Sequence, residues 1–447
     1  MRKKIVFIGA GSTIFMKNII GDILKFPAIS NSSFALMDVD EKRLSESEVV
    51  TKELIAQSKS NATVQTFKDQ KNALQNADFV VVAFQIGGYQ PCTVTDFEIP
   101  KKYNLRQTIG DTLGIGGIMR GLRTVPYLWA LCEDMLSVCP DAILLQYVNP
   151  MAINTWAIGA KYPAIKQIGL CHSVQGTLNE LARDLGTDIT KIHYQVAGIN
   201  HLAFFLELKE LQSDGTYKDL YPILKVLGKK GKASANTGAN DRCPNFVRYK
   251  FLEHFGYFVT ESSEHFVEYV PWFIKSHKPD LIDHFKIPLD EYPKRCQEQI
   301  AEWKNLTKDI INNAPPEHTK SHEYAADIIN SVSSGDPCTI YGNVINNGYI
   351  EGLPYNAAVE VPCLIDGSGV HPQRTLNIPP HLLALIRTNI NVQELTVLSL
   401  LNQDIESVYH AAMLDPHTGA ELDLDQIKSL VNELIHEHGE WMPSWLQ

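Results

Sequence analysis

No stretch of this sequence is apolar for long enough to cross a membrane. A spanning helix needs roughly 20 uninterrupted apolar residues, and polar or charged residues break every apolar run of these 447 residues sooner. The first such run follows the basic residues Arg2, Lys3 and Lys4 and ends at Gly9, too early for the core of a signal peptide. We therefore expect a cytoplasmic protein with no membrane partner.

The sequence also lacks paired cysteines and an excess of positive charge. Its eight cysteines are scattered without a CxxC pair, which argues against a disulfide framework and a structural zinc site. Lysine and arginine number 40 against 51 acidic residues, which gives a formal net charge of -11. Because an acidic surface repels phosphate backbones, nucleic acid is not an expected partner.

Apolar, β-branched runs alternate with helical patterns through the first part of the chain. This alternation is typical of a parallel sheet covered by helices on both faces. Six strands with crossover helices predict a complete, doubly wound Rossmann domain over residues 1–197. The predicted strands are 5–8, 34–37, 79–84, 142–147, 167–170 and 194–197, with helices around 15–24, 41–57, 117–139, 151–159 and 174–184.

The alternation ends at about residue 198. Strands are expected at 202–208 and 256–260, a polar loop at 229–240, and helices near 382–389, 393–401 and 424–438. Residues 198–447 are therefore predicted to form an α+β domain for substrate binding and oligomerisation. The whole is an α/β fold with an architecture like that of lactate and malate dehydrogenases.

A nucleotide-binding turn follows the first predicted strand. Glycines in Gly9-Ala10-Gly11-Ser12-Thr13 allow a tight turn, and the amides that open the next helix can face a pyrophosphate. Ile14 replaces the third glycine of the full fingerprint. Asp38, at the end of the second strand, can bind a ribose hydroxyl and would repel a 2′-phosphate, which favours NAD over NADP. The alternative is an ordinary turn, with Asp38 capping the following helix.

Two residues that can ligate a metal lie where strands of this sheet should end. A thiolate from Cys171 and an imidazole from His201 can share one divalent cation and leave positions open for substrate. Asn149 lies at a third strand end. Spacing alone slightly favours ordinary structural roles, with Cys171 a buried small residue and His201 a core or capping histidine.

Two further segments carry ionisable side chains. Asp111 lies in a glycine-rich loop before a helix, where capping the helix is the simpler role. Glu264, His265, Glu268 and Tyr269 belong to a dense run that begins at Glu261. Such a run is more often a solvated face than a catalytic strip.

These segments, taken in order along essentially the whole chain, resemble glycoside hydrolase family 4, and within it the melibiase-type α-galactosidases. The resemblance implies an NAD-dependent glycosidase with a manganese or other divalent site at Cys171 and His201. It rests on Ile8-Gly9-Ala10-Gly11-Ser12-Thr13, Ala83-Phe84-Gln85-Ile86-Gly87-Gly88-Tyr89, Asn149-Pro150-Met151, Gly169-Leu170-Cys171-His172-Ser173, Gly198-Ile199-Asn200-His201, Glu264-His265 and Tyr409-His410-Ala411-Ala412-Met413.

The family's mechanism departs from the usual scheme of two carboxylates. It implies that the sugar is oxidised at C3 with NAD, after which a base removes the C2 proton. The cation stabilises the enediolate as a Lewis acid. Elimination of the C1 leaving group, addition of water and re-reduction then complete hydrolysis without net use of cofactor.

The resemblance also implies roles for single residues. Asn149 is similar to the family's substrate-binding asparagine. His172 takes the place of an aspartate that acts as leaving-group acid in related α-phosphoglucosidases. Tyr269 is the expected base, assisted by Asp111, and His265 or Glu264 are the alternatives.

The substrate is expected to be an unphosphorylated α-galactoside. Relatives that act on phosphosugars grip the 6-phosphate with an arginine after the fourth strand, and residues 85–100 contain none. Arg295 is a candidate for another substrate contact. The alternatives are a dehydrogenase of a small hydroxy acid, a non-catalytic regulator, or a family 4 α-glucosidase or α-glucuronidase. The family suggests a homodimer or homotetramer.

Overall fold

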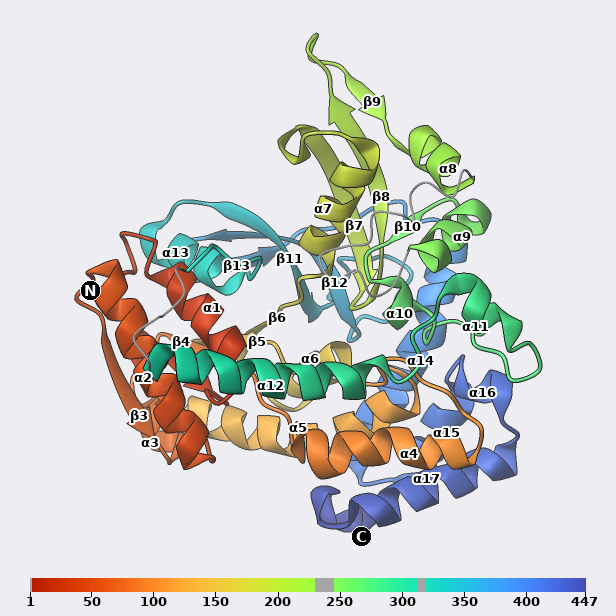
Figure 1. The fold of residues 1–447 in the computed structure, drawn as a ribbon, viewed down its shortest axis with the longest axis horizontal. Helices are drawn as coiled ribbons and strands as arrows, with labels where there is room; N and C mark the ends of the chain where they lie inside the picture. Colours follow the sequence, from red (N-terminus) through yellow and green to blue (C-terminus); the bar gives the residue numbers. More distant parts are fainter. Residues whose placement is uncertain (1, 230–244, 312–317) are drawn as a thin grey trace.

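The computed structural model describes residues 2–229, 245–311 and 318–447, and its strands form one mixed sheet (Figure 1). Most of the loop predicted at 229–240 therefore falls outside the described residues. The strand order is β10-β8-β7-β12-β11-β6-β5-β4-β1-β2-β3, with β13 and β9 paired to β12 and β8. No helix in the described ranges has the length and apolar character required to cross a membrane.

The parallel half of the sheet confirms the predicted Rossmann fold. Its order, β3-β2-β1-β4-β5-β6, is that of a complete dinucleotide-binding domain. The strands are β1 (Lys4–Ile8), β2 (Ser33–Met37), β3 (Thr63–Phe67), β4 (Phe79–Val82), β5 (Ile143–Gln146) and β6 (Lys166–Gly169).

The prediction from sequence missed one strand and misassigned another. β3 was not predicted, because its sequence TVQTF is polar and half exposed at the edge of the sheet. Residues 194–197 do form a strand, but they belong to β7 (Ile192–Ile199), which is antiparallel to β8 and β12. The predicted division at 197/198 falls inside β7, and it stays a prediction.

Helices cover both faces of the parallel half. Successive residues of each strand point to opposite sides of the sheet, so a strand that is apolar throughout needs a covering layer on each side. In β1, Ile5 and Phe7 join one buried apolar cluster and Val6 and Ile8 join a second. The covering helices include α1 (Thr13–Ile23), α2 (Glu41–Ser58), α5 (Gly114–Val138) and α6 (Met151–Lys161). A strand that is apolar on both faces is therefore stable only inside this sandwich.

Antiparallel strands extend the sheet beyond β6. β11 (Cys338–Ile345) and β12 (Ala358–Asp366) lie between β6 and β7, so the two halves share one continuous sheet. β7 and β8 (Leu202–Leu211) form a hairpin. The short strands are β9 (Tyr217–Asp219), β10 (Phe258–Val259) and β13 (Gly369–Pro372).

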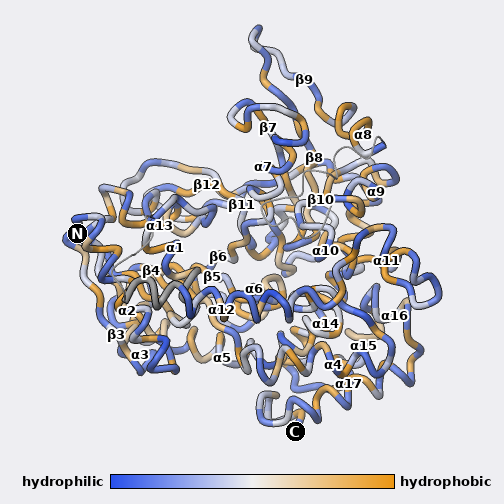
Figure 2. The backbone as a smooth tube through the Cα atoms, in the orientation of Figure 1, coloured by the Kyte–Doolittle hydropathy of each residue, from blue (hydrophilic) through white to orange (hydrophobic). Residues whose placement is uncertain are grey.

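The C-terminal helices form a layer beside α5. The two helices predicted at 382–389 and 393–401 are one helix, α14 (Pro380–Asn402), since neither Gly nor Pro interrupts them. Orange and blue alternate along α15 (Ile405–Leu414) and α17 (Leu424–His438) in Figure 2, as helices with one buried face require. α12 (Glu291–Ile311) runs across the middle of Figure 1.

The remaining helical segments connect these layers. They are α3 (Gln70–Leu74), η1 (Gly88–Thr93), α4 (Val94–Lys102), α7 (Ser173–Leu185), η2 (Ile189–Lys191), α8 (Tyr221–Lys229), α9 (Phe246–Phe255), α10 (Ser263–Phe266), α11 (Asp280–Phe285), α13 (Ala325–Ser334), α16 (Thr418–Glu421), η4 (Gly439–Trp441) and η5 (Ser444–Leu446).

Candidate active site

The glycine turn after β1 has the geometry that a dinucleotide site needs. Gly9 has φ +83°, and a Cβ there would lie 2.4 Å from the Ala83 carbonyl oxygen, so no side chain fits. The Gly11 amide donates to Asp38 Oδ2 at 2.7 Å, which joins the turn to the end of β2. Ser12 is exposed, and α1 begins at Thr13. The structure therefore joins the predicted glycine turn to the predicted ribose-binding carboxylate of Asp38.

Cys171 and His201 meet where β6 and β7 end. Cys171 Sγ lies 3.4 Å from His201 Nε2, although thirty residues separate them in sequence. Glu261 adds a carboxylate oxygen 3.2 Å from the same nitrogen. The three ligand atoms lie within 4.8 Å of one another, and we call these residues the cation cluster. Thiolate, imidazole and carboxylate together suit a divalent transition metal, so the residues fit the predicted cation.

The charges in the cation cluster depend on its burial. Burial raises the pKa of Cys171 well above its ordinary value, and Glu261 and Glu360 add to this effect. Burial would also raise the pKa of Glu261, but His265 and His201 lower it to about 2. Glu261 is therefore ionised at neutral pH, whereas Cys171 must lose a proton when a cation binds. Sequence analysis noticed the dense run that begins at Glu261 but did not assign Glu261 as a ligand.

A row of polar side chains leads from the cation cluster to Asp111. His201 has φ +64° in the two-residue turn between β7 and β8, and its Nδ1 lies 3.0 Å from the Tyr269 hydroxyl. Tyr269 is buried, and the Thr112 side chain lies close enough to lower the pKa of its phenol. The Thr112 hydroxyl donates to Asp111 Oδ1 at 2.8 Å. The structure thus brings together Tyr269 and Asp111, which were predicted to act as base and assistant.

Asp111 also contacts the predicted substrate residue. The Asn149 amide donates to Asp111 Oδ2 at 3.0 Å, and Arg120 Nη1 lies 3.9 Å from the same oxygen. Burial opposes ionisation, but Arg120 and the nearby histidines lower the pKa of Asp111. The N-cap of α5 is Leu113, which makes no side-chain cap bond, so Asp111 does not take the simpler capping role.

The run after Glu261 is buried, and its members have defined partners. Glu268 accepts the amides of residues 108–110, which fixes the loop that carries Asp111. Burial raises the pKa of Glu268 to about 7. The ring of His265 lies 4.9 Å from that of His201. The expectation that this run is a solvated face is therefore wrong.

Arg295 and His172 lie at the margin of this group. Arg295 forms ion pairs with Glu264 and Glu291, so two carboxylates already occupy part of its guanidinium. The side chain of His172 is 70% exposed, and its Nδ1 lies 3.8 Å from Glu323 Oε1. Within the described ranges neither residue forms a hydrogen bond or ion pair with the cation cluster, although His172 is close enough to help lower the pKa of Glu261, and their predicted roles stay predictions.

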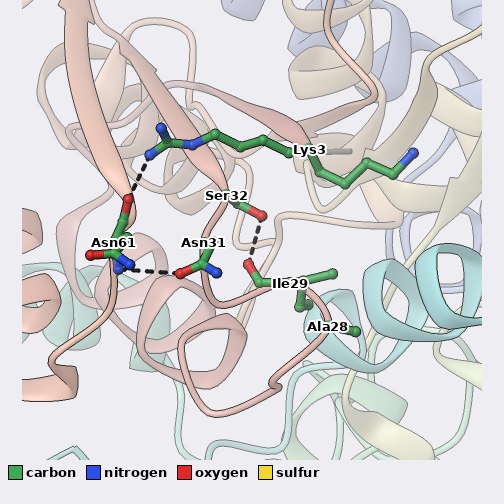
Figure 3. A pocket seen from close by; sticks show the side chains of 7 residues that line it. Lys3, Ala28, Ile29, Asn31, Ser32 and Asn61 are labelled. Atoms are coloured by element: carbon green, nitrogen blue, oxygen red, sulfur yellow. Dashed lines mark hydrogen bonds between the residues drawn. The ribbon is translucent and has the colours of Figure 1, made fainter.

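A separate hollow of about 410 Å³ lies at the amino ends of the parallel strands, opposite the carboxyl ends that carry the predicted site. Its lining comes from the amino ends of β1 and β2 and from the segment before β3 (Figure 3). Arg2, at its rim, already donates to Asn61 and Thr63. Because ligands of such sheets bind at the carboxyl ends of the strands, we assign this hollow no role in catalysis.

Burial also raises the pKa of Glu360 on β12 to about 8, with His201 opposing and Glu261 adding to the shift. No sequence pattern singled out Glu360, since it lies in a largely apolar strand far along the chain from the other site residues.

Comparison with known proteins identifies the family. The family 4 glycosyl hydrolase model matches residues 4–187, and the model of its C-terminal domain matches residues 196–418. An α-galactosidase of Bacillus subtilis (strain 168) is 48% identical over 99% of this chain and 100% of that protein. An α-galactosidase of Rhizobium meliloti is 28% identical over 99% of this chain and 89% of that protein.

Solved structures agree with the fold. The structure of lplD from Bacillus subtilis matches with a TM-score of 0.87 at 25% identity, over 97% of this chain and 99% of that one. A 6-phospho-α-glucosidase from gut microorganisms, in complex with NAD and Mn²⁺, matches with a TM-score of 0.81 at 19% identity over 99% of both chains. A lactate dehydrogenase of Cryptosporidium parvum matches at 0.52 and 14% identity over 90% of this chain and 99% of that one, as the predicted architecture requires. The chain is a member of the family 4 glycosyl hydrolases.

Proposed function

We propose that this chain hydrolyses unphosphorylated α-galactosides with NAD and a divalent cation. The observation that carries the proposal is the meeting of Cys171, His201 and Glu261 at the end of a Rossmann sheet. A hydroxy-acid dehydrogenase has no use for this thiol–imidazole–carboxylate group. The full-length similarity to α-galactosidases supports the choice of sugar.

The two bound groups have distinct tasks. When bound, NAD supplies reversible oxidation of a sugar carbinol and the cation supplies Lewis acidity. The turn Gly9-Ala10-Gly11-Ser12-Thr13 and Asp38 would hold the nucleotide, as an NAD-selective Rossmann site does. Cys171, His201 and Glu261 would hold the cation.

The residues around the cation cluster would bind the sugar and move its C2 proton. Asn149 and Asp111 offer an amide and a carboxylate for sugar hydroxyls. Burial and neighbouring carboxylates raise the pKa of Tyr269, so the chain alone keeps this phenol protonated. With His201 Nε2 turned toward the cluster, Nδ1 keeps its proton and donates to the Tyr269 oxygen, which favours the phenolate that removes the C2 proton.

His172 would protonate the leaving group. Its exposed imidazole lies next to Cys171 in sequence, and a histidine side chain can serve as a general acid. Glu323 Oε1 lies 3.8 Å from its Nδ1. Arg295 would contact the substrate from α12, using the donors that Glu264 and Glu291 leave available.

The absence of arginine from residues 85–100 supports an unphosphorylated substrate. The arginines of α5 near residues 85–100 already have partners: Arg123 pairs with Asp96, and Arg120 bonds to Tyr292 beside Asp111. Among the described residues these contacts compete directly with a phosphate for each guanidinium.

The chain is also proposed to act in the cytoplasm as a homodimer or homotetramer. A reducing compartment keeps the Cys171 thiol available for a metal, and it contains NAD. The proposed division of the chain at 197/198 would place the nucleotide turn in one domain and most of the oligomer contacts in the other. Light scattering on purified protein measures the oligomeric state directly.

The test is an assay of purified protein with NAD, Mn²⁺ and a reducing agent. We expect p-nitrophenyl α-galactoside to be hydrolysed, and the glucoside, glucuronide and 6-phospho counterparts to react at least tenfold more slowly. Cys171→Ser should abolish turnover, which rules out a contaminating hydrolase and a non-catalytic regulator. No nitrophenol release, together with accumulation of NADH from a hydroxy acid, would favour the dehydrogenase instead.

A further inference from the structure

Beneath the cation cluster, the sheet buries the carboxyl group of Glu360, which is 0% exposed. Within the described residues neither of its oxygens meets the geometry of a hydrogen bond, although the Asn343 side chain lies close enough to lower its pKa. No ion pair to it occurs within residues 2–229, 245–311 and 318–447. Asn343, opposite Glu360 in the register of β11 and β12, makes no hydrogen bond of ordinary geometry with it.

The strand register places Glu360 under the cluster. Glu360 pairs with Gly198 of β7 on one side and Asn343 of β11 on the other, and Asn343 pairs in turn with Gly169 of β6. Cys171 follows Gly169 by two residues, and His201 follows Gly198 by three. The charge of Glu360 acts on Cys171, His201 and Glu261 together.

Two residues close to Glu360 in the strand register, or in sequence to its register partner, carry further buried polar atoms. Asn200 follows Gly198 by two residues, and Asn343 is paired with Glu360. Among the described residues, both side-chain polar atoms of Asn200 and Oδ1 of Asn343 have no hydrogen bond. Gly169 lets Asn343 approach β6 closely, because a Cβ on residue 169 would lie only 2.9 Å from the Cβ of Asn343.

Burying one such polar group without a bond destabilises a fold, and native structures usually satisfy these groups with protein, water or an ion. A cation held by Cys171, His201 and Glu261 would be the positive charge that this group lacks. Glu360 is not among the residues whose ligand atoms lie within 4.8 Å of one another, so it would act through an intervening layer.

We infer that Glu360 is a positioning residue for the cation cluster, and that it orients the cation's coordination shell through buried water shared with Asn200 and Asn343. This inference rests on the cation site of the proposed function and is independent of the choice of sugar. Outer-shell groups of this kind fix the orientation of metal ligands.

The experiment measures Mn²⁺ binding to full-length protein that a chelator has first freed of metal. Calorimetry gives the Kd, and the electron paramagnetic resonance spectrum of bound Mn²⁺ reports the symmetry of its shell. We expect Glu360→Gln to weaken binding about 10- to 100-fold and to change the spectrum. Asp415→Asn is the control, because Asp415 is also buried with one unpartnered oxygen but belongs to the turn after α15. It should bind Mn²⁺ like the wild type.

The possible outcomes separate the two proposals. Wild-type affinity and spectrum in Glu360→Gln would overturn the role of Glu360 while leaving the cation site intact. Failure of the wild type to bind Mn²⁺ would remove the cation site and, with it, this inference. If Glu360→Gln does not fold, Asn200→Ala gives the same test, and unchanged binding in that variant contradicts the shared water layer.

Discussion

Gly9 occupies a backbone conformation that a side chain does not tolerate. In Gly9→Ala the new methyl group meets the Ala83 carbonyl at 2.4 Å and φ +83° becomes strained. We expect a loss of about 1–3 kcal/mol in unfolding free energy, together with NAD binding weakened at least tenfold. Gly176→Ala in α7 is the control, since no atom lies within 4 Å of its Cβ. Titration calorimetry with NAD and thermal unfolding check both variants, and normal NAD affinity in Gly9→Ala contradicts the assignment of the turn.

The side chain of Tyr269 has one polar atom, its hydroxyl oxygen, which lies next to His201 Nδ1. Tyr269→Phe removes the hydroxyl that lies 3.0 Å from Nδ1 and keeps the ring. Because a positioned base contributes about 10²- to 10⁴-fold, we expect kcat to fall by that factor and exchange of the substrate's C2 proton with solvent to stop. The Kd for Mn²⁺ should change much less. A variant that still exchanges this proton at the wild-type rate would show that another residue is the base.

At the scale of elements, Glu268 holds the Asp111 loop against the segment that carries Tyr269. Its pKa is raised from 4.5 to about 7 by burial, so the folded state binds a proton more tightly than the unfolded chain does. Stability from this group is present below pH 4.5 and is lost as the pH rises toward 7. The loss amounts to about 3 kcal/mol at most.

Glu268→Gln removes this titration. The difference in unfolding free energy, wild type minus variant, should therefore fall between pH 5 and pH 7.5 and then become constant. Urea unfolding at several pH values measures it. Glu253→Gln changes an exposed carboxylate whose pKa is lowered by Lys250, and it should show no such fall. A constant difference for Glu268→Gln would mean that the carboxyl group does not titrate in this range.

At the scale of the whole molecule, the single sheet joins a nucleotide turn at the end of β1 to a cation cluster beyond β6 and β7. Oxidation followed by elimination replaces the C2 hydrogen, whereas ordinary hydrolysis does not. Hydrolysis in deuterated water should therefore place deuterium at C2 of the released galactose, with no net formation of NADH. Mass spectrometry of the sugar detects this label, and retained protium would contradict the elimination route.

The cation should also stabilise the whole fold, since it would connect β6, the β7–β8 hairpin and the segment at Glu261. At a Mn²⁺ concentration of 100 times Kd, binding adds about 2.7 kcal/mol. A chelator should lower Tm and activity, and added Mn²⁺ should restore both. Cys171→Ser should lose the Mn²⁺-dependent rise in Tm, and indifference of the wild type to chelation would exclude a structural and catalytic cation.

Local sequence patterns were enough to predict the Rossmann half of the sheet, its glycine turn and the position of Asp38 at the end of the second strand. Strand periodicity, a turn that only glycine fits and an acid at the end of the next strand are all properties of short segments. Edge strand β3 was not predicted, because its residues are polar and partly exposed. Cys171 and His201 were predicted to be metal ligands only through resemblance, because a thiol and an imidazole thirty residues apart carry no spacing signal.

Tertiary structure alone decided the rest of the site. Glu261 becomes a cluster member because it follows β10, which pairs with β8. Glu360 lies beneath the cluster because β11 and β12 insert between β6 and β7 rather than following them in sequence order. That insertion depends on pairing between segments more than a hundred residues apart, for which no local pattern codes. The sequence by itself thus determined the nucleotide domain, while the long-range pairing of strands determined which carboxyl groups lie near the predicted cation site.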